Sequence, residues 1–93
     1  METYNVYGIT DCPACLRACA LLMEKDIEYS FVESDFSPTY RKALKKQWNW
    51  NTFPIVVKLS ISEDYEISST IVGGYDELLD LLACEDSGID WTL

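Results

Sequence analysis

The 93-residue sequence contains no histidine and only seven lysines and arginines against sixteen acidic residues. Without histidine, the chain cannot form a Ser-His or Cys-His hydrolase site or a histidine-ligated metal site. The formal net charge of −9 argues against nucleic acid and anionic membranes as partners, because both bind basic surfaces.

Long apolar runs are also missing. No stretch approaches the ~20 residues that span a bilayer, and Met1-Glu2-Thr3 lacks the basic and apolar regions of a secretory signal. We therefore expect a cytoplasmic protein with a single domain over residues 1–93. In such a reducing setting, closely spaced cysteines indicate redox chemistry or metal binding and not a structural disulfide.

The hydrophobic pattern predicts alternating strands and helices. The expected elements are a strand at 4–9, a helix at 13–25, a strand at 28–33, a helix from Pro38 with Ser37 as its N-cap, strands at 55–61 and 65–71, and a helix at 75–84. A strand–helix–strand crossover followed by a hairpin gives an α/β fold, a four-stranded mixed sheet with three helices on both faces.

Several apolar residues are expected to pack inward from the helices. Tyr40, Leu44 and Trp48 form one stripe at a spacing of four residues. In the last helix we expect the four leucines to face the core, and we expect apolar residues of the tail 87–93 to pack back on it: Leu78, Leu79, Leu81 and Leu82, then Ile89, Trp91 and Leu93.

Cys12 and Cys15 stand two residues apart where the first strand passes into the first helix. A helix start presents unpaired N–H groups and roughly +0.5 of a charge, which favours the thiolate, the nucleophilic form of cysteine. We expect Cys12 to attack and Cys15, one turn further on, to resolve. Pro13 suits the first helical position, where its missing N–H costs nothing. Asp11 is a like charge that should weaken the preference for a thiolate.

Three motifs in this element order resemble the glutaredoxin family of the thioredoxin fold. They are Cys12-Pro13-Ala14-Cys15, Thr52-Phe53-Pro54 and residues 71–78, which contain Gly73-Gly74 before an acidic helix start. The resemblance implies a cis bond at Phe53–Pro54 beside the two sulfurs. Many glutaredoxins have lysine, tyrosine and valine where this chain has Ile9, Ala14 and Phe53.

The resemblance also implies a binding site for glutathione. The backbone of Phe53 and Pro54 would pair with the tripeptide, and Gly74 with the Asp76 N–H would hold its γ-glutamyl carboxylate. The side chains of Asp76 and Glu77 would lie near its ammonium group. Arg41 is the expected partner of the glycine carboxylate, with Lys45 as second choice, since a guanidinium suits a carboxylate.

By this resemblance the chain is a monomeric, glutathione-dependent thiol–disulfide oxidoreductase that reduces protein disulfides or glutathionylated thiols. Glutathione is its co-substrate, no cofactor is bound, and ribonucleotide reductase is an expected client by family analogy.

Two alternatives stay open. Cys12, with Cys15 and Cys19, could hold a metal or an iron–sulfur cluster in a carrier protein. The chain could also be a thioredoxin-like reductant served by a flavin reductase. Against the metal or cluster alternative, we expect Cys19 to be a small residue of the core and Cys84 to be structural.

Overall fold

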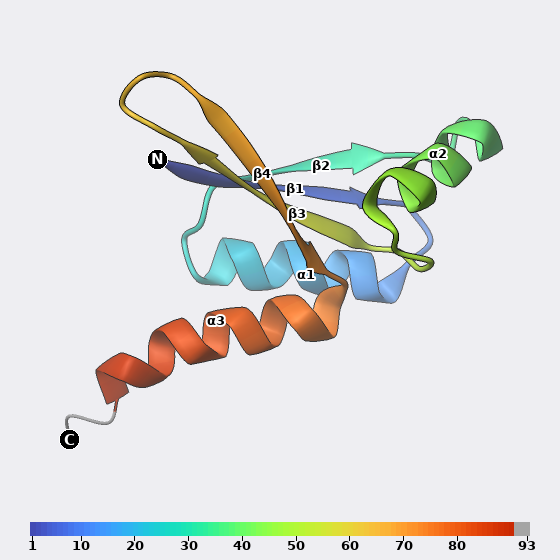
Figure 1. Cartoon of the computed structure of the whole chain (residues 1–93). Coiled ribbons are helices and arrows are strands. Elements are labelled where there is room, and N and C mark those ends of the chain that lie inside the picture. The colour runs from blue at the N-terminus through green and yellow to red at the C-terminus, as the bar shows by residue number, and fades with distance from the viewer. Residues whose placement is uncertain (91–93) are drawn as a thin grey trace.

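The computed structural model describes the backbone of residues 1–90 and the side chains of residues 1–83. The elements follow the expected order: β1 (Glu2–Gly8), α1 (Pro13–Glu24), β2 (Tyr29–Glu33), α2 (Pro38–Trp48), β3 (Ile55–Ile61), β4 (Ile67–Gly73) and α3 (Tyr75–Asp90). The sheet has the strand order β2-β1-β3-β4, with β1 and β2 parallel and the other pairs antiparallel (Figure 1). This arrangement confirms the predicted mixed α/β fold. Among the residues that the structure describes, no helix has the length and apolar character required to cross a membrane.

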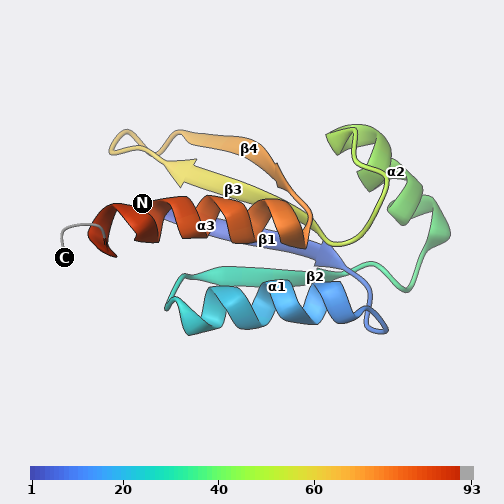
Figure 2. The same ribbon diagram turned by 90° about the horizontal axis from the view of Figure 1, so that it is seen from below.

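The sheet carries helices on both faces. Helices α1 and α3 lie side by side on one face, whereas α2 lies at the end of the sheet where β1 and β2 finish (Figures 1 and 2). Strand β3 contributes side chains to the core on both faces of the sheet, because neighbouring side chains of a strand point to opposite faces. Val56 packs with Leu22 and Leu78 beneath α1 and α3, and Ile55 and Val57 pack with Leu44 of α2.

The predicted stripe of α2 is confirmed. Tyr40 and Trp48 pack around the buried Leu44, and Trp50 of the following loop joins the same cluster. Ser37 is the N-cap as expected, since its Oγ accepts the N–H of Tyr40 at 3.1 Å.

The start of the last strand was predicted wrongly. Strand β4 begins at Ile67 and not at Tyr65, because Tyr65 has a left-handed φ of 65° that breaks the extended backbone. The turn instead closes through the Ser62 N–H, which donates to the Glu66 carbonyl at 2.9 Å. The hairpin loop is therefore longer than the sequence pattern indicated.

The last helix also departs from expectation. It continues to Asp90, past the predicted end near residue 84, and this segment contains no proline that would interrupt its hydrogen bonds. Leu78 and Leu82 are buried, but Leu79 is 40% exposed because 100° per residue turns it away from their stripe. The expected packing of Ile89, Trp91 and Leu93, and the role of Cys84, lie outside the described side chains.

Gly8 lets the start of α1 approach the end of β1 closely. A Cβ at this position would lie 2.8 Å from Cys15 Sγ and 2.9 Å from Cε1 of Phe31. Both distances are shorter than a carbon side chain tolerates. Because Gly8 has no side chain, Cys15 can pack directly against the sheet.

Gly8→Ala should reduce the free energy of unfolding by about 1–3 kcal/mol, because the added methyl group overpacks the space that Cys15 occupies. Urea unfolding of the reduced protein measures this loss. The double variant Gly8→Ala/Cys15→Ala is the control, since it removes the closest clashing atom. Its loss should be smaller than the sum of the two single losses, and a simple sum would show that the sulfur is not the obstacle.

Candidate active site

The sulfur of Cys12 caps the first helix. Cys12 has an extended backbone (φ −146°, ψ 102°), and its Sγ accepts the backbone N–H of Cys15 at 3.2 Å. Pro13 follows as the first helical residue, as expected. The cap places a half-buried sulfur at the end of α1 where N–H groups are unpaired, which is the position that favours a thiolate.

Cys15 is in a different environment. Its side chain is fully buried, and this burial, together with a hydrogen bond to the Cys12 side chain, raises the pKa of Cys15 from an ordinary 9.0 to about 12. At neutral pH Cys15 is therefore a protonated thiol. Burial also raises the pKa of Cys19, which packs against the core beneath α1, in agreement with its expected role as a core residue.

A groove of about 310 Å³ lies beside this helix start. One wall comes from α1, one from the loop before β3, and one from the first turn of α3. The residues that line it are Ala14, Arg17, Thr52, Phe53, Pro54, Gly74, Tyr75, Asp76 and Glu77. The Phe53–Pro54 peptide bond is cis, as the resemblance implied. The fold thus assembles the three sequence motifs around one groove.

The turn at Gly73-Gly74 requires its glycines. Gly73 has a φ of 127°, and a Cβ there would lie 2.9 Å from Cβ of Glu77 and 3.0 Å from Cη2 of Trp50. Trp50 therefore packs against this turn.

Glu77 and Asp76 differ in their surroundings. The Glu77 Oε1 accepts the N–H of Gly74 at 2.9 Å, so this carboxylate caps the start of α3. Both residues line the groove, but the Glu77 carboxylate is hydrogen-bonded to the backbone at the start of α3. This leaves Asp76 as the carboxylate without such a capping bond among the residues that the structure describes there.

The two candidate cations from α2 have different neighbours. The Lys45 Nζ lies over the Phe53 ring, 5.4 Å from its centroid. The Arg41 Nη1 donates to the carbonyl oxygens of Ser34 at 2.8 Å and Asp35 at 3.0 Å. Lys45 thus contacts a residue of the groove, whereas Arg41 holds the loop between β2 and α2. The assignment of Arg41 to a carboxylate stays a prediction.

Arg17 is a groove residue that the sequence reasoning missed. It lies three positions after Ala14, and residues at this spacing share one side of a helix. That spacing relative to the cysteine motif is the signal that could have identified it.

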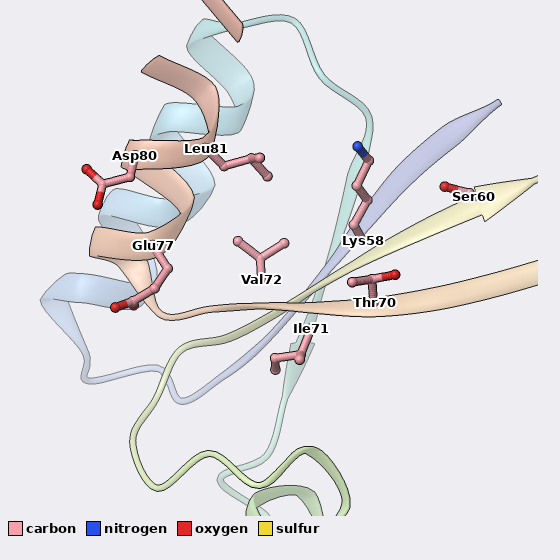
Figure 3. Close-up of a pocket in the computed structure, with 8 residues that line it drawn as sticks. All are labelled: Lys58, Ser60, Thr70, Ile71, Val72, Glu77, Asp80 and Leu81. Atoms are coloured by element: carbon pink, nitrogen blue, oxygen red, sulfur yellow. The ribbon is translucent and has the colours of Figure 1, made fainter. Parts of the chain in front are cut away.

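A larger hollow of about 600 Å³ lies away from the thiols, between α3 and the β3–β4 hairpin. Figure 3 shows Val72 and Leu81 pointing into this space, with Glu77 at its end nearest the Gly73-Gly74 turn. It contains no residue of the Cys12–Cys15 or Thr52–Pro54 motifs, whereas the smaller groove is lined by residues of both. The smaller groove is therefore the one that bears on the chemistry.

A metal site formed by the chain alone would need several ligating side chains close together. Within the part of the chain that the structure describes, no group of three or more cysteine, aspartate or glutamate side chains is arranged to hold a metal ion. Cys12, Cys15 and Cys19 in particular do not form such a group.

Comparison with known proteins identifies the relatives of this chain. Residues 5–59 match the family model for glutaredoxin. Glutaredoxin 1 of Rickettsia conorii is 35% identical over 83 residues, which cover 87% of this chain and 72% of the relative. Glutaredoxin 1 of Rickettsia typhi is 32% identical over 83 residues, which cover 87% of this chain and 71% of the relative. The solution structure of glutaredoxin from Brucella melitensis superimposes with a TM-score of 0.64 at 31% identity, covering 92% of this chain and 80% of that one. A structure described as "Metal Binding of Glutaredoxins" gives a TM-score of 0.53 at 33% identity, with coverages of 95% and 83%.

The buried Cys15 makes stability depend on alkaline pH. The unfolded chain loses the Cys15 proton near pH 9, whereas the folded chain keeps it up to about pH 12. The unfolded state therefore binds fewer protons in this window, and the free energy of unfolding falls as pH rises. The contribution is fully present at pH 8 and below, and about 1 kcal/mol of it should be lost between pH 8 and pH 10.

Urea unfolding of the reduced protein at these two pH values, compared with Cys15→Ala, measures this contribution. The variant should lose less stability than the wild type over the same interval. Equal losses would show that Cys15 titrates alike in the folded and unfolded states.

Proposed function

The chain belongs to the glutaredoxin family and is a thiol–disulfide oxidoreductase, and we propose that glutathione is its electron donor. The observation that carries this proposal is the Cys12 sulfur at the start of α1, next to a groove built from the cis Phe53–Pro54 bond and the Gly73-Gly74 turn. The volume of the groove, about 310 Å³, falls within the range of small-molecule binding sites and so supports the binding of a tripeptide.

Each end of glutathione has a suitable partner in this proposal. The backbone of Phe53 pairs with the cysteinyl residue of the tripeptide in the manner of an added strand. The first N–H groups of α3, that of Asp76 among them, bind the γ-glutamyl carboxylate, because a helix start attracts an anion. The Asp76 carboxylate faces the ammonium group. At the other end Lys45, which lies over Phe53, supplies positive charge to the glycine carboxylate.

Reduction of a glutathionylated thiol needs only Cys12. Its thiolate attacks the glutathione sulfur of the substrate disulfide, a new sulfur–sulfur bond forms, and the substrate leaves as a thiolate that takes a proton. The thiolate of a second glutathione then attacks the bound glutathione sulfur. This step releases oxidised glutathione and restores the Cys12 thiolate.

Reduction of a protein disulfide uses both cysteines. After Cys12 has formed a mixed disulfide, Cys15 passes its proton to the departing thiolate and attacks the Cys12 sulfur. The substrate leaves fully reduced, and Cys12 and Cys15 are joined by a disulfide. Two glutathione molecules then reduce this bond and become oxidised glutathione. The high pKa of Cys15 keeps it protonated until the mixed disulfide exists.

The proposed clients are protein disulfides and glutathionylated thiols, and ribonucleotide reductase is an expected client of this class.

Cys12→Ser should abolish turnover of a glutathionylated peptide, since it removes the nucleophile, whereas Cys15→Ser should retain most of it. Reduction of a protein disulfide should fall by roughly a hundredfold or more in both variants. Turnover is followed with glutathione and glutathione reductase, and in parallel with a flavin-dependent thioredoxin reductase. Cys19→Ser is the matched control and should keep both activities. Turnover that only the flavin enzyme supports would overturn the glutathione proposal.

Lys45→Gln should raise the KM for a glutathionylated peptide about fivefold without lowering kcat, because it removes charge attraction worth about 1 kcal/mol in the bound state. Lys46→Gln, an exposed change on the same helix, is the control. Arg41→Gln is measured alongside. If only the arginine variant raises KM, the glycine carboxylate is bound by Arg41 as the sequence suggested, and the assignment to Lys45 is wrong.

A further inference from the structure

A network of hydrogen bonds holds the loop that leads into Cys12. The backbone N–H of Thr10 donates to Oδ1 and Oδ2 of Asp35 at 3.0 and 3.2 Å, and the Thr10 hydroxyl donates to Oδ2. Asp35 lies 25 residues further along the chain, in the connection between β2 and α2. One carboxylate therefore receives both donors of a residue that stands two positions before the nucleophile.

The connection that carries Asp35 is itself fixed on both sides. Toward β1, the buried Ser34 donates its N–H and its hydroxyl to the Gly8 carbonyl, both at 2.8 Å. Toward α2, the Arg41 Nη1 donates to the carbonyls of Ser34 and Asp35. Asp35 thus links the connection held by α2 to the loop that leads into Cys12.

The bonds from Asp35 fix the middle of this loop, whose last residue, Cys12, is held by its cap on α1. Residues 9–12 lie between the last residue of β1 and the first residue of α1. Fixing the backbone of each residue costs roughly 1–2 kcal/mol of entropy, and hydrogen bonds to a charged group offset part of that cost. The direction in which the chain enters α1 decides where the Cys12 sulfur stands relative to the groove.

We propose that Asp35 is a positioning residue for Cys12: its bonds to Thr10 hold the nucleophile in line with a disulfide bound in the groove. Asp35 does not touch the reacting atoms in this proposal. It rests on Cys12 being the attacking sulfur of the proposed function, but not on glutathione being the electron donor.

The proposal separates alignment from the reactivity of the thiol. In-line attack on a bound disulfide requires a set direction, and misplacement by about 1 Å can cost up to about a hundredfold in rate. A small alkylating reagent approaches the same sulfur from any open side. Loss of the bonds between Asp35 and Thr10 should therefore slow disulfide reduction much more than it slows alkylation of Cys12.

The test uses pre-reduced protein and insulin as the disulfide substrate, in a single-turnover reaction without glutathione. Asp35→Ala should slow this reaction roughly tenfold, whereas the rate of Cys12 alkylation by iodoacetamide should change less than about threefold. Asp35→Asn should restore the rate to within about threefold of wild type. Its amide oxygen can accept the Thr10 N–H, and its amide nitrogen can donate to the Thr10 hydroxyl.

Two further variants separate the bonds from the charge. Thr10→Val, which loses only the hydroxyl donor, should slow the reaction less than Asp35→Ala does. Asp64→Ala removes the same charge from the β3–β4 turn, at the opposite end of the sheet from the cysteine loop (Figure 1), and should leave the rate unchanged.

Three outcomes would overturn the proposal. They are a wild-type rate in Asp35→Ala, an Asp35→Asn variant as slow as Asp35→Ala, and equal losses in disulfide reduction and alkylation. Because insulin reduction is measured without glutathione, failure of the glutathione proposal leaves this test intact.

Discussion

The hydrogen bond from the Cys15 N–H to the Cys12 sulfur joins the fold of this protein to its chemistry. The sulfur replaces the oxygen that usually caps a helix, so the group that begins α1 is also the proposed nucleophile. Its position follows from the strand that precedes it and the helix that follows it. The groove lies beside this sulfur, and the bonds from Asp35 to Thr10 hold the backbone that leads to it.

The two thiols differ in burial, although they stand only three positions apart. Cys12 is half-buried at the helix end, whereas Cys15 lies within the core against the backbone of β1, where only the absence of a side chain at Gly8 leaves room for it. Burial holds Cys15 in its neutral form and raises its pKa. This difference supports the proposed order, in which Cys12 attacks and Cys15 resolves.

Charged residues around the site also hold the backbone that forms it. Glu77 caps α3 at the Gly73-Gly74 turn, and Arg41 bonds the loop beside Asp35. Lys45, four positions after Arg41 on the same helix, instead lies over the Phe53 ring. In a chain with a net charge of −9, Lys45 is the basic residue of α2 for which the structure shows a contact with a residue that lines the groove.

The sequence by itself determined the element order, the mixed sheet, the cap at Ser37 and the place of the cysteine motif at the start of the first helix. These features depend on local periodicity, on capping residues and on the spacing of one motif, all of which act over a few residues. Only the tertiary structure decided that Arg17 lines the groove, that Lys45 contacts Phe53 and that Asp35 holds Thr10. Those contacts join residues far apart in the chain or on different elements, and no local pattern specifies which side chains meet there. The late start of β4 belongs with them, since a left-handed φ at Tyr65 is a backbone choice that its residue type does not announce.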